Sequence, residues 1–175
     1  MSADGPPESP GSGEEPAADT SAHTEMRRSG PSGAEFAKFW MENPDAIPPS
    51  AKLLGCRPLE ADPERGFCRS AFDNKPEFRN PMGALQGGFV AAMLDDTMAI
   101  GGLFKIGGGY IVPTLEMKVN FVRPATTDEV FAEGWLVHAG RTIAFLGGRL
   151  LDANEEVCAT ATATAIIRPF KRIAD

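Results

Sequence analysis

The longest apolar stretch of the chain, residues 87–104, constrains the fold more than any other segment. Its content of Ala, Met and Leu favours a helix over a strand, and three consecutive glycines, residues 107–109, follow as a stop signal. Asp95 and Asp96 stand in its middle, and two such charges argue against a membrane span. A helix this apolar needs cover on most of its sides, so the rest of the chain must wrap around it.

Strand-like segments flank this predicted helix on both sides. Two short strands are predicted at residues 52–58 and 66–72. After the helix, a four-strand meander is predicted at about 110–122, 129–138, 141–152 and 155–168. Alternation predicts one face made of Leu115, Met117, Val119 and Phe121, and the last strand alternates Ala with Thr. One antiparallel sheet wrapped around a long central helix, an α+β fold, is the economical arrangement.

The N-terminal segment differs in composition from the rest. Residues 1–32 are rich in Pro, Gly and Ser and contain no Leu, Ile, Val or aromatic residue, which predicts a disordered tail. Residues 33–175 then form a single domain, which opens with an amphipathic helix at 33–43. Most of the net charge of −7 lies in the tail, so the domain is close to balance. That balance argues against a nucleic-acid partner.

Several classes of chemistry find no support in the sequence. The only two histidines are His23 and His138, and no Cys-x-x-Cys pair is present, so neither a metal site nor another cofactor is predicted. The nucleophile elbow, the phosphate-binding loop and the dinucleotide fingerprint are also missing. The three cysteines lack close pairing and are interpreted as reduced, buried thiols of a cytoplasmic protein.

Two features remain that chemistry could use. A carboxylate inside an apolar helix is costly unless it is paired or functional. Asp95 and Asp96 cannot share a helix face, so one is expected to point inward and the other outward. Gln86, Gly87 and Gly88 precede the helix, and the free N–H groups of a helix N-terminus can polarise a carbonyl oxygen. Each feature also has a purely structural explanation: the two aspartates could be solvated surface acids, and the two glycines could simply cap the helix.

Together these residues resemble the hot-dog thioesterase superfamily, specifically the PaaI-like acyl-CoA thioesterases. Four blocks carry the resemblance in the family's order and cover about 35–168. The first has Asn80, Gly83, Gln86-Gly87-Gly88 and Asp95 at the family's spacings. The others are residues 114–125, ending in Arg-Pro-Ala, residues 137–141, and the closing strand at 159–163.

The resemblance implies hydrolysis of acyl-CoA at an interface between two subunits. Gly87 would offer its N–H to the thioester carbonyl, and Asp95 would act as nucleophile or as general base on water. Asn80 would orient the water or the thioester, and Thr114 would hold water by its hydroxyl. Asn80 and Gly87 would come from one subunit, and Asp95 and Thr114 from another, in a homodimer or a homotetramer built as a dimer of dimers.

Gln86 departs from the family pattern, which has His at this position. Gln can donate and accept hydrogen bonds at similar reach but cannot take up a proton near neutral pH. Gln86 and Gly88 are expected to contact the substrate, and Arg123 and Arg141 to bind the phosphates of CoA. Two rival functions stay open, a non-catalytic acyl-CoA-binding protein and a hot-dog hydratase.

Overall fold

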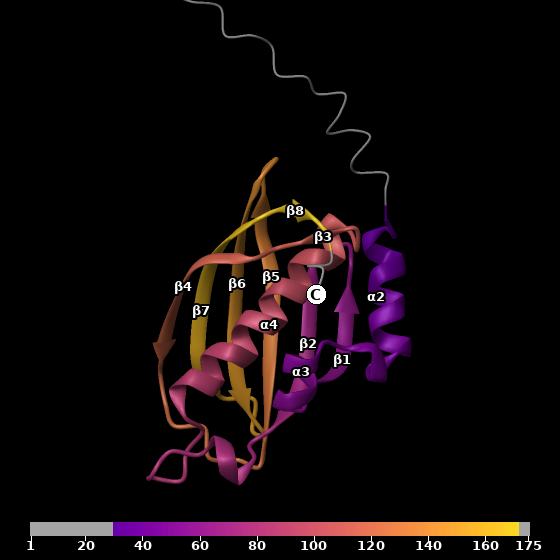
Figure 1. Cartoon of the computed structure of the whole chain (residues 1–175). Helices are drawn as coiled ribbons and strands as arrows, with labels where there is room; N and C mark the ends of the chain where they lie inside the picture. Colours follow the sequence, from indigo (N-terminus) through magenta and orange to yellow (C-terminus); the bar gives the residue numbers. More distant parts are fainter. Residues whose placement is uncertain (1–29, 172–175) are drawn as a thin grey trace, which may run out of the picture.

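The computed structural model describes residues 30–171; the predicted tail, apart from residues 30–32, lies outside this range. Its helices and strands, in chain order, are α2 (Gly33–Glu42), the 3-10 turn η1 (Pro44–Ala46), α3 (Pro49–Leu54), β1 (Arg57–Asp62), β2 (Phe67–Asp73), η2 (Pro76–Phe78), α4 (Gly87–Ile106), β3 (Tyr110–Ile111), β4 (Thr114–Phe121), β5 (Glu129–Ala139), β6 (Ile143–Asp152), β7 (Val157–Ile166) and β8 (Arg168–Pro169). The α+β fold is confirmed, since α4 lies across one face of an antiparallel sheet (Figure 1). No helix in the described range is long and apolar enough to cross a membrane.

The six strands of the main sheet run in the order β1-β2-β5-β6-β7-β4, and β3 pairs separately with β8. The predicted meander is therefore wrong in one respect, because β4 pairs with β7 and not with β5. The reason is that α4 packs mainly on β5, β2 and β6 and covers the middle of the sheet. The chain leaving the helix can join the sheet only at a free edge, which β7 provides. β4 is then an edge strand (Figure 1).

The two N-terminal helices lie on the same side of the sheet as α4 and pack against that helix, with α2 also beside β1 (Figure 1). α2 is the predicted amphipathic helix, begun by a capping box between Ser32 and Glu35. Its Trp40 is buried, and the Phe36 ring lies 5.9 Å from that of Phe104 on α4. The strand predicted at 52–58 begins too early, since residues 49–54 form α3 and β1 starts only at Arg57. Pro49 stands in the first turn of that helix, where the missing N–H costs nothing.

The central helix approaches the sheet most closely where both backbones lack side chains. A Cβ atom added to Gly101 would lie 2.5 Å from the carbonyl oxygen of Gly134 on β5. A Cβ atom on Gly134 would lie as close to the backbone of Thr97 and Met98. This pair of glycines brings helix and strand into direct contact and fixes the position of α4 over the sheet.

The predicted alternation of the last two sheet strands is largely confirmed. The alanines of β7 are buried, while Thr162 between them is exposed. On β4, Met117 and Val119 are half-buried against the core. Leu115 departs from the expected face and is 60% exposed, because the pairing with β7 shifts between Thr114 and Glu116. That irregularity leaves Thr114 free to face the helix.

Candidate active site

The first turn of α4 begins at Gln86, which is the N-cap residue. Its side-chain Oε1 accepts a hydrogen bond of 2.6 Å from the Gly88 N–H, and its backbone carbonyl accepts from Phe89 and Val90. Gly87 N–H donates to no acceptor within residues 30–171. It is therefore an open donor at the positive end of a 20-residue helix.

The loop before this turn is held in place by Asn80. The Asn80 Oδ1 accepts hydrogen bonds from the N–H groups of Met82, at 2.9 Å, and Ala84, at 3.2 Å. Gly83 takes a positive φ of 82° inside the loop, and its own N–H donates to the Asn80 carbonyl. The backbone carbonyl and the Oδ1 of Asn80 are both occupied, while its amide NH₂ donates to no acceptor among the described residues.

Asn80, Gly87 and Arg123 line one pocket of about 340 Å³, hereafter the Asn80 pocket. Phe121 forms its wall: a Cβ atom on Gly87 would lie 3.1 Å from the Phe121 ring. A side chain at position 87 would fill the space beside the free N–H. The glycine keeps that approach open for a ligand.

Asp95 lies two turns further along α4 and contacts Thr114. The Thr114 hydroxyl donates a hydrogen bond of 2.6 Å to the Asp95 Oδ1. Asp95 is half-buried and Thr114, at the start of the edge strand, is exposed. The hydroxyl holds one carboxylate oxygen and leaves the second open to the edge of the sheet.

Asp96 points the other way, as expected from helical geometry. Its Oδ2 is buried and has no hydrogen-bond partner among the described residues. Burial, followed by the charge of Asp95, raises the pKa of Asp96 to about 6. Burial likewise raises the pKa of Cys56 to about 11, so this thiol stays protonated at neutral pH. All three cysteines are free and buried, as predicted.

Within one chain the site falls into two separate parts. Gly87 and Asp95 are eight residues apart on one helix, which corresponds to a rise of roughly 12 Å. Neither Asp95 nor Thr114 lines the Asn80 pocket. One thioester carbonyl cannot contact both the Gly87 N–H and the Asp95 carboxylate of the same chain.

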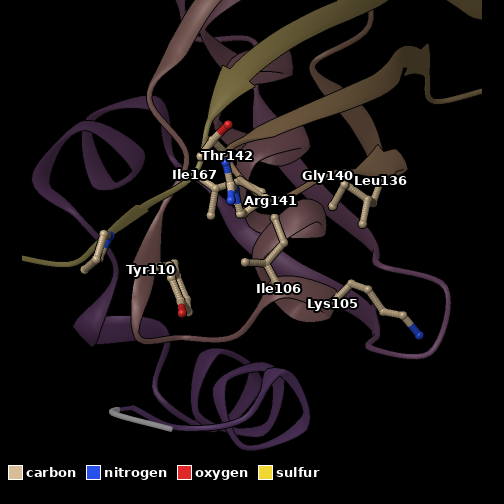
Figure 2. Close-up of a pocket in the computed structure, with 10 residues that line it drawn as sticks. Lys105, Ile106, Tyr110, Leu136, Gly140, Arg141, Thr142 and Ile167 are labelled. Atoms are coloured by element: carbon tan, nitrogen blue, oxygen red, sulfur yellow. The ribbon is translucent and has the colours of Figure 1, made fainter. Parts of the chain in front are cut away.

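The two arginines expected to bind phosphate lie in different surroundings. Arg123 lines the Asn80 pocket but forms an ion pair with Glu156, which sequence reasoning missed because the partner follows 33 residues later. Arg141 lines a second pocket, of about 270 Å³, near the C-terminal end of α4. Figure 2 shows Arg141 beside Thr142 and Ile167, with the Lys105 amine directed away from them. Lys105 instead donates to the Glu64 carbonyl.

Comparison with known proteins identifies the family. The thioesterase superfamily matches residues 82–159, which include the helix start, both aspartates and Thr114. The structure superposes on that of the phenylacetic acid degradation-related protein of Ralstonia eutropha JMP134 with a TM-score of 0.69 and 30% sequence identity. The match covers 75% of this chain and 98% of that one. The chain belongs to the PaaI-like hot-dog thioesterases.

Other hot-dog thioesterases share the fold at lower identity. A thioesterase family protein from Silicibacter pomeroyi has a TM-score of 0.68 at 23% identity, with 77% of this chain and 99% of that chain covered. A thioesterase from Haemophilus influenzae has a TM-score of 0.67 at 18% identity, with 77% and 92% covered. None of the curated proteins matches the sequence of this chain.

Proposed function

We propose that this protein hydrolyses acyl-CoA thioesters to the free acid and CoA, with Asp95 as the catalytic carboxylate. The hydrogen bond from Thr114 to Asp95 is the observation that carries the proposal. It fixes the orientation of a carboxylate inside an otherwise apolar helix, as catalysis requires. Membership of the thioesterase superfamily supports thioester hydrolysis in general.

The separation of the two half-sites supports an assembly in which two copies complete each site. β4 pairs with β7 on one side and with no strand of the described residues on the other, and it carries Leu115 and Phe121, each 60% exposed. An edge with exposed apolar side chains favours pairing with a second strand. A two-fold axis beside β4 would set Asn80 and Gly87 of one copy against Asp95 and Thr114 of the other, and would form two equal sites. A homodimer, alone or as half of a tetramer, is the proposed functional unit.

The chemistry follows from these groups. The Gly87 N–H would bind the thioester oxygen and stabilise the negative charge that develops on it during attack. With Asp95 as general base, a water adds to the carbonyl carbon and gives its proton to the carboxylate. The carbon–sulfur bond then breaks, and the proton passes from Asp95 to the CoA thiolate. With Asp95 as nucleophile, its oxygen adds to the carbon, the carbon–sulfur bond breaks and CoA leaves as the thiolate. Water then cleaves the resulting anhydride, which releases the acid, restores the Asp95 carboxylate and supplies the proton for the CoA thiolate.

The position of Arg141 suits the far end of CoA better than the thioester itself. Lys105, in the same pocket, lies ten residues beyond Asp95 on α4, a rise of roughly 15 Å. A long flexible arm separates the thioester of acyl-CoA from its phosphates, so both could be bound at once. Arg141 forms no ion pair within residues 30–171 and remains available to a phosphate, whereas Arg123 is paired with Glu156. We place the protein in the cytoplasm, where its three free thiols would stay reduced.

The rival function, a non-catalytic acyl-CoA-binding protein, rests on Gln86. Its side chain is held by Gly88 N–H and cannot exchange protons near neutral pH. Hydrolysis by Asp95 as described needs no proton from position 86, so the substitution is compatible with activity. The hydratase alternative lacks support, because His138 lies on β5 and lines neither the Asn80 pocket nor the pocket around Arg141.

An assay of the purified full-length chain separates these functions. A panel of straight-chain and aromatic acyl-CoAs is incubated with a thiol reagent that reports free CoA. We expect turnover by the wild type and a loss of about 100-fold or more in kcat for Asp95→Asn. Asp96→Asn is the matched control. The Asp96 carboxylate points into the core, so this variant should retain activity. Binding without turnover by the wild type would establish the rival function.

Single turnover in water labelled with oxygen-18 distinguishes the two roles of Asp95. General-base catalysis places the label in the released acid. Label in the Asp95 carboxylate identifies nucleophilic catalysis, because solvent oxygen enters that side chain only when water opens an anhydride at its Asp95 carbonyl. Mass spectrometry of the acid and of the peptide that contains Asp95 reads both outcomes.

A further inference from the structure

A second hollow adjoins the first turn of α4, on the side away from the Asn80 pocket. It is the α3–α4 groove, lined by Ser50, Leu53, Leu54, Phe89 and Ala92 together with Gln86 and Gly88. Its volume of about 370 Å³ falls in the range of small-molecule sites. Neither the proposed catalytic steps nor the proposed phosphate contacts use it.

The walls of the groove are apolar and firmly supported. Leu54 is buried, and the Phe89 ring stacks on Phe78 with centroids 4.1 Å apart. Leu53 is 67% exposed on α3, and Ala92 is exposed on α4. One exposed leucine is ordinary on a protein surface. Here the leucine borders a hollow in which Leu54 and Phe89 are packed against the core, and such a firm apolar base suits an apolar ligand.

The position of the groove decides what it would hold. Gly87 lines the Asn80 pocket, while its two neighbours Gln86 and Gly88 line the α3–α4 groove. The free Gly87 N–H therefore lies between a pocket in which Asn80 and Arg123 stand among apolar residues and a groove that has no charged residue in its lining. A thioester has the same asymmetry, because a polar thiol half and an apolar acyl half extend from the two sides of its carbonyl.

We propose that the α3–α4 groove binds the acyl group of the substrate and that Leu53 and Ala92 determine which acyl chains are accepted. The proposal rests on the thioesterase function above and specifies its substrate class as acyl groups with an extended apolar chain. Ala92 lies one helical turn beyond Gly88 on the same face of α4, so its side chain limits the length of the groove. Each methylene buried there should raise kcat/KM by about fourfold until the groove is filled.

The test measures kcat/KM of the full-length protein for straight-chain acyl-CoAs from acetyl to decanoyl. For the wild type we expect a rise with chain length. Ala92→Phe should lower kcat/KM by about tenfold or more for the long chains and leave acetyl-CoA unchanged, because the ring occupies only the distal part of the groove. Ala34→Phe, the same change at an exposed position of α2, is the control and should leave the profile unchanged.

A second variant guards against misfolding of the first. Leu53→Ser removes one wall at a largely exposed position, and it should flatten the dependence on chain length without loss of acetyl-CoA hydrolysis. If the wild type is active and both variants keep its chain-length profile, the groove does not bind the acyl group. If the wild type hydrolyses no acyl-CoA at all, the proposed function fails and the groove proposal fails with it.

Discussion

The two halves of α4 differ in their surroundings although they belong to one continuous helix, and only the first combines buried residues (Val90, Met93 and Leu94) with exposed ones. In residues 87–95, Gly88 and Ala92 are exposed and Asp95 faces the edge of the sheet. Residues 97–104 are almost all buried, and Gly101 touches the backbone of β5. The buried half fixes the helix to the sheet, and this rigid attachment holds the open half with its donor and carboxylate in place. A precise site depends on such support.

The largest effect is expected where the buried half contacts the sheet. Gly101→Ala should lower the free energy of unfolding by about 3 kcal/mol, because its Cβ would meet the Gly134 backbone, which cannot move aside. Gly102→Ala is the matched control, since its Cβ meets only the end of the Leu146 side chain. Denaturant unfolding at fixed protein concentration measures both. Equal costs would show that the close approach at Gly101 does not determine the position of the helix.

Asp96, which lies between the two halves of α4, is expected to make the free energy of unfolding depend on pH. The pKa of Asp96 is raised to about 6 in the folded chain, so the folded state binds this proton more tightly than the unfolded state does. The stabilisation that this proton gives the folded state is therefore lost as the pH rises from about 4 through 6. The Asp96→Asn variant should have a free energy of unfolding about 2 kcal/mol higher than the wild type at pH 7.5, and nearly the same at pH 4. The raised pKa of Asp96 sets the limit, because it corresponds to about 3 kcal/mol at most.

Unfolding curves of the wild type and Asp96→Asn at a series of pH values test this expectation. A constant difference between the two proteins across the series would contradict it. Because Asp95→Asn alters the neighbouring carboxylate as well, the same series with that variant shows how much of the shift depends on the Asp95 charge.

Within the open half, the Thr114 hydroxyl is expected to matter for turnover. Thr114→Val keeps the shape but removes the hydrogen bond to the Asp95 carboxylate, and kcat should fall about tenfold. Thr114→Ser keeps the hydroxyl and should retain most of the activity. Steady-state kinetics with one acyl-CoA separate the effect on kcat from that on KM. Full activity of Thr114→Val would contradict a role of the hydroxyl, and a loss in Thr114→Ser alone would point to packing of the methyl group.

The smallest effect is expected at the helix cap. Gln86→Ala removes the acceptor for the Gly88 N–H and should cost about 1 kcal/mol of stability. Gln86→Glu keeps an acceptor and places a negative charge at the helix N-terminus, so its stability should equal or exceed that of the wild type. Thermal unfolding of both variants checks the cap. Any loss of activity in Gln86→Glu then reports a role of the side-chain NH₂ toward substrate.

Local patterns predicted much of this molecule. The apolar segment predicted α4, and the adjacency of Asp95 and Asp96 predicted opposite orientations, because helical geometry acts over a few residues. Residues 52–56 were wrongly assigned to a strand, since the prolines at 49 and 58 permit both a helix start and an edge strand. α3 therefore went unrecognised, and with it the α3–α4 groove, although Leu53 and Leu54 after the proline pair were the available signal.

The sequence by itself determined that a carboxylate and a helix N-terminus would lie on one buried helix, because both features are properties of neighbouring residues. Only the tertiary structure decided that β4 joins the sheet beside β7, which brings Thr114 to Asp95 across 19 residues and leaves the strand at an open edge. Pairing of distant segments depends on which edges and faces are still free when they pack, and no local pattern encodes that.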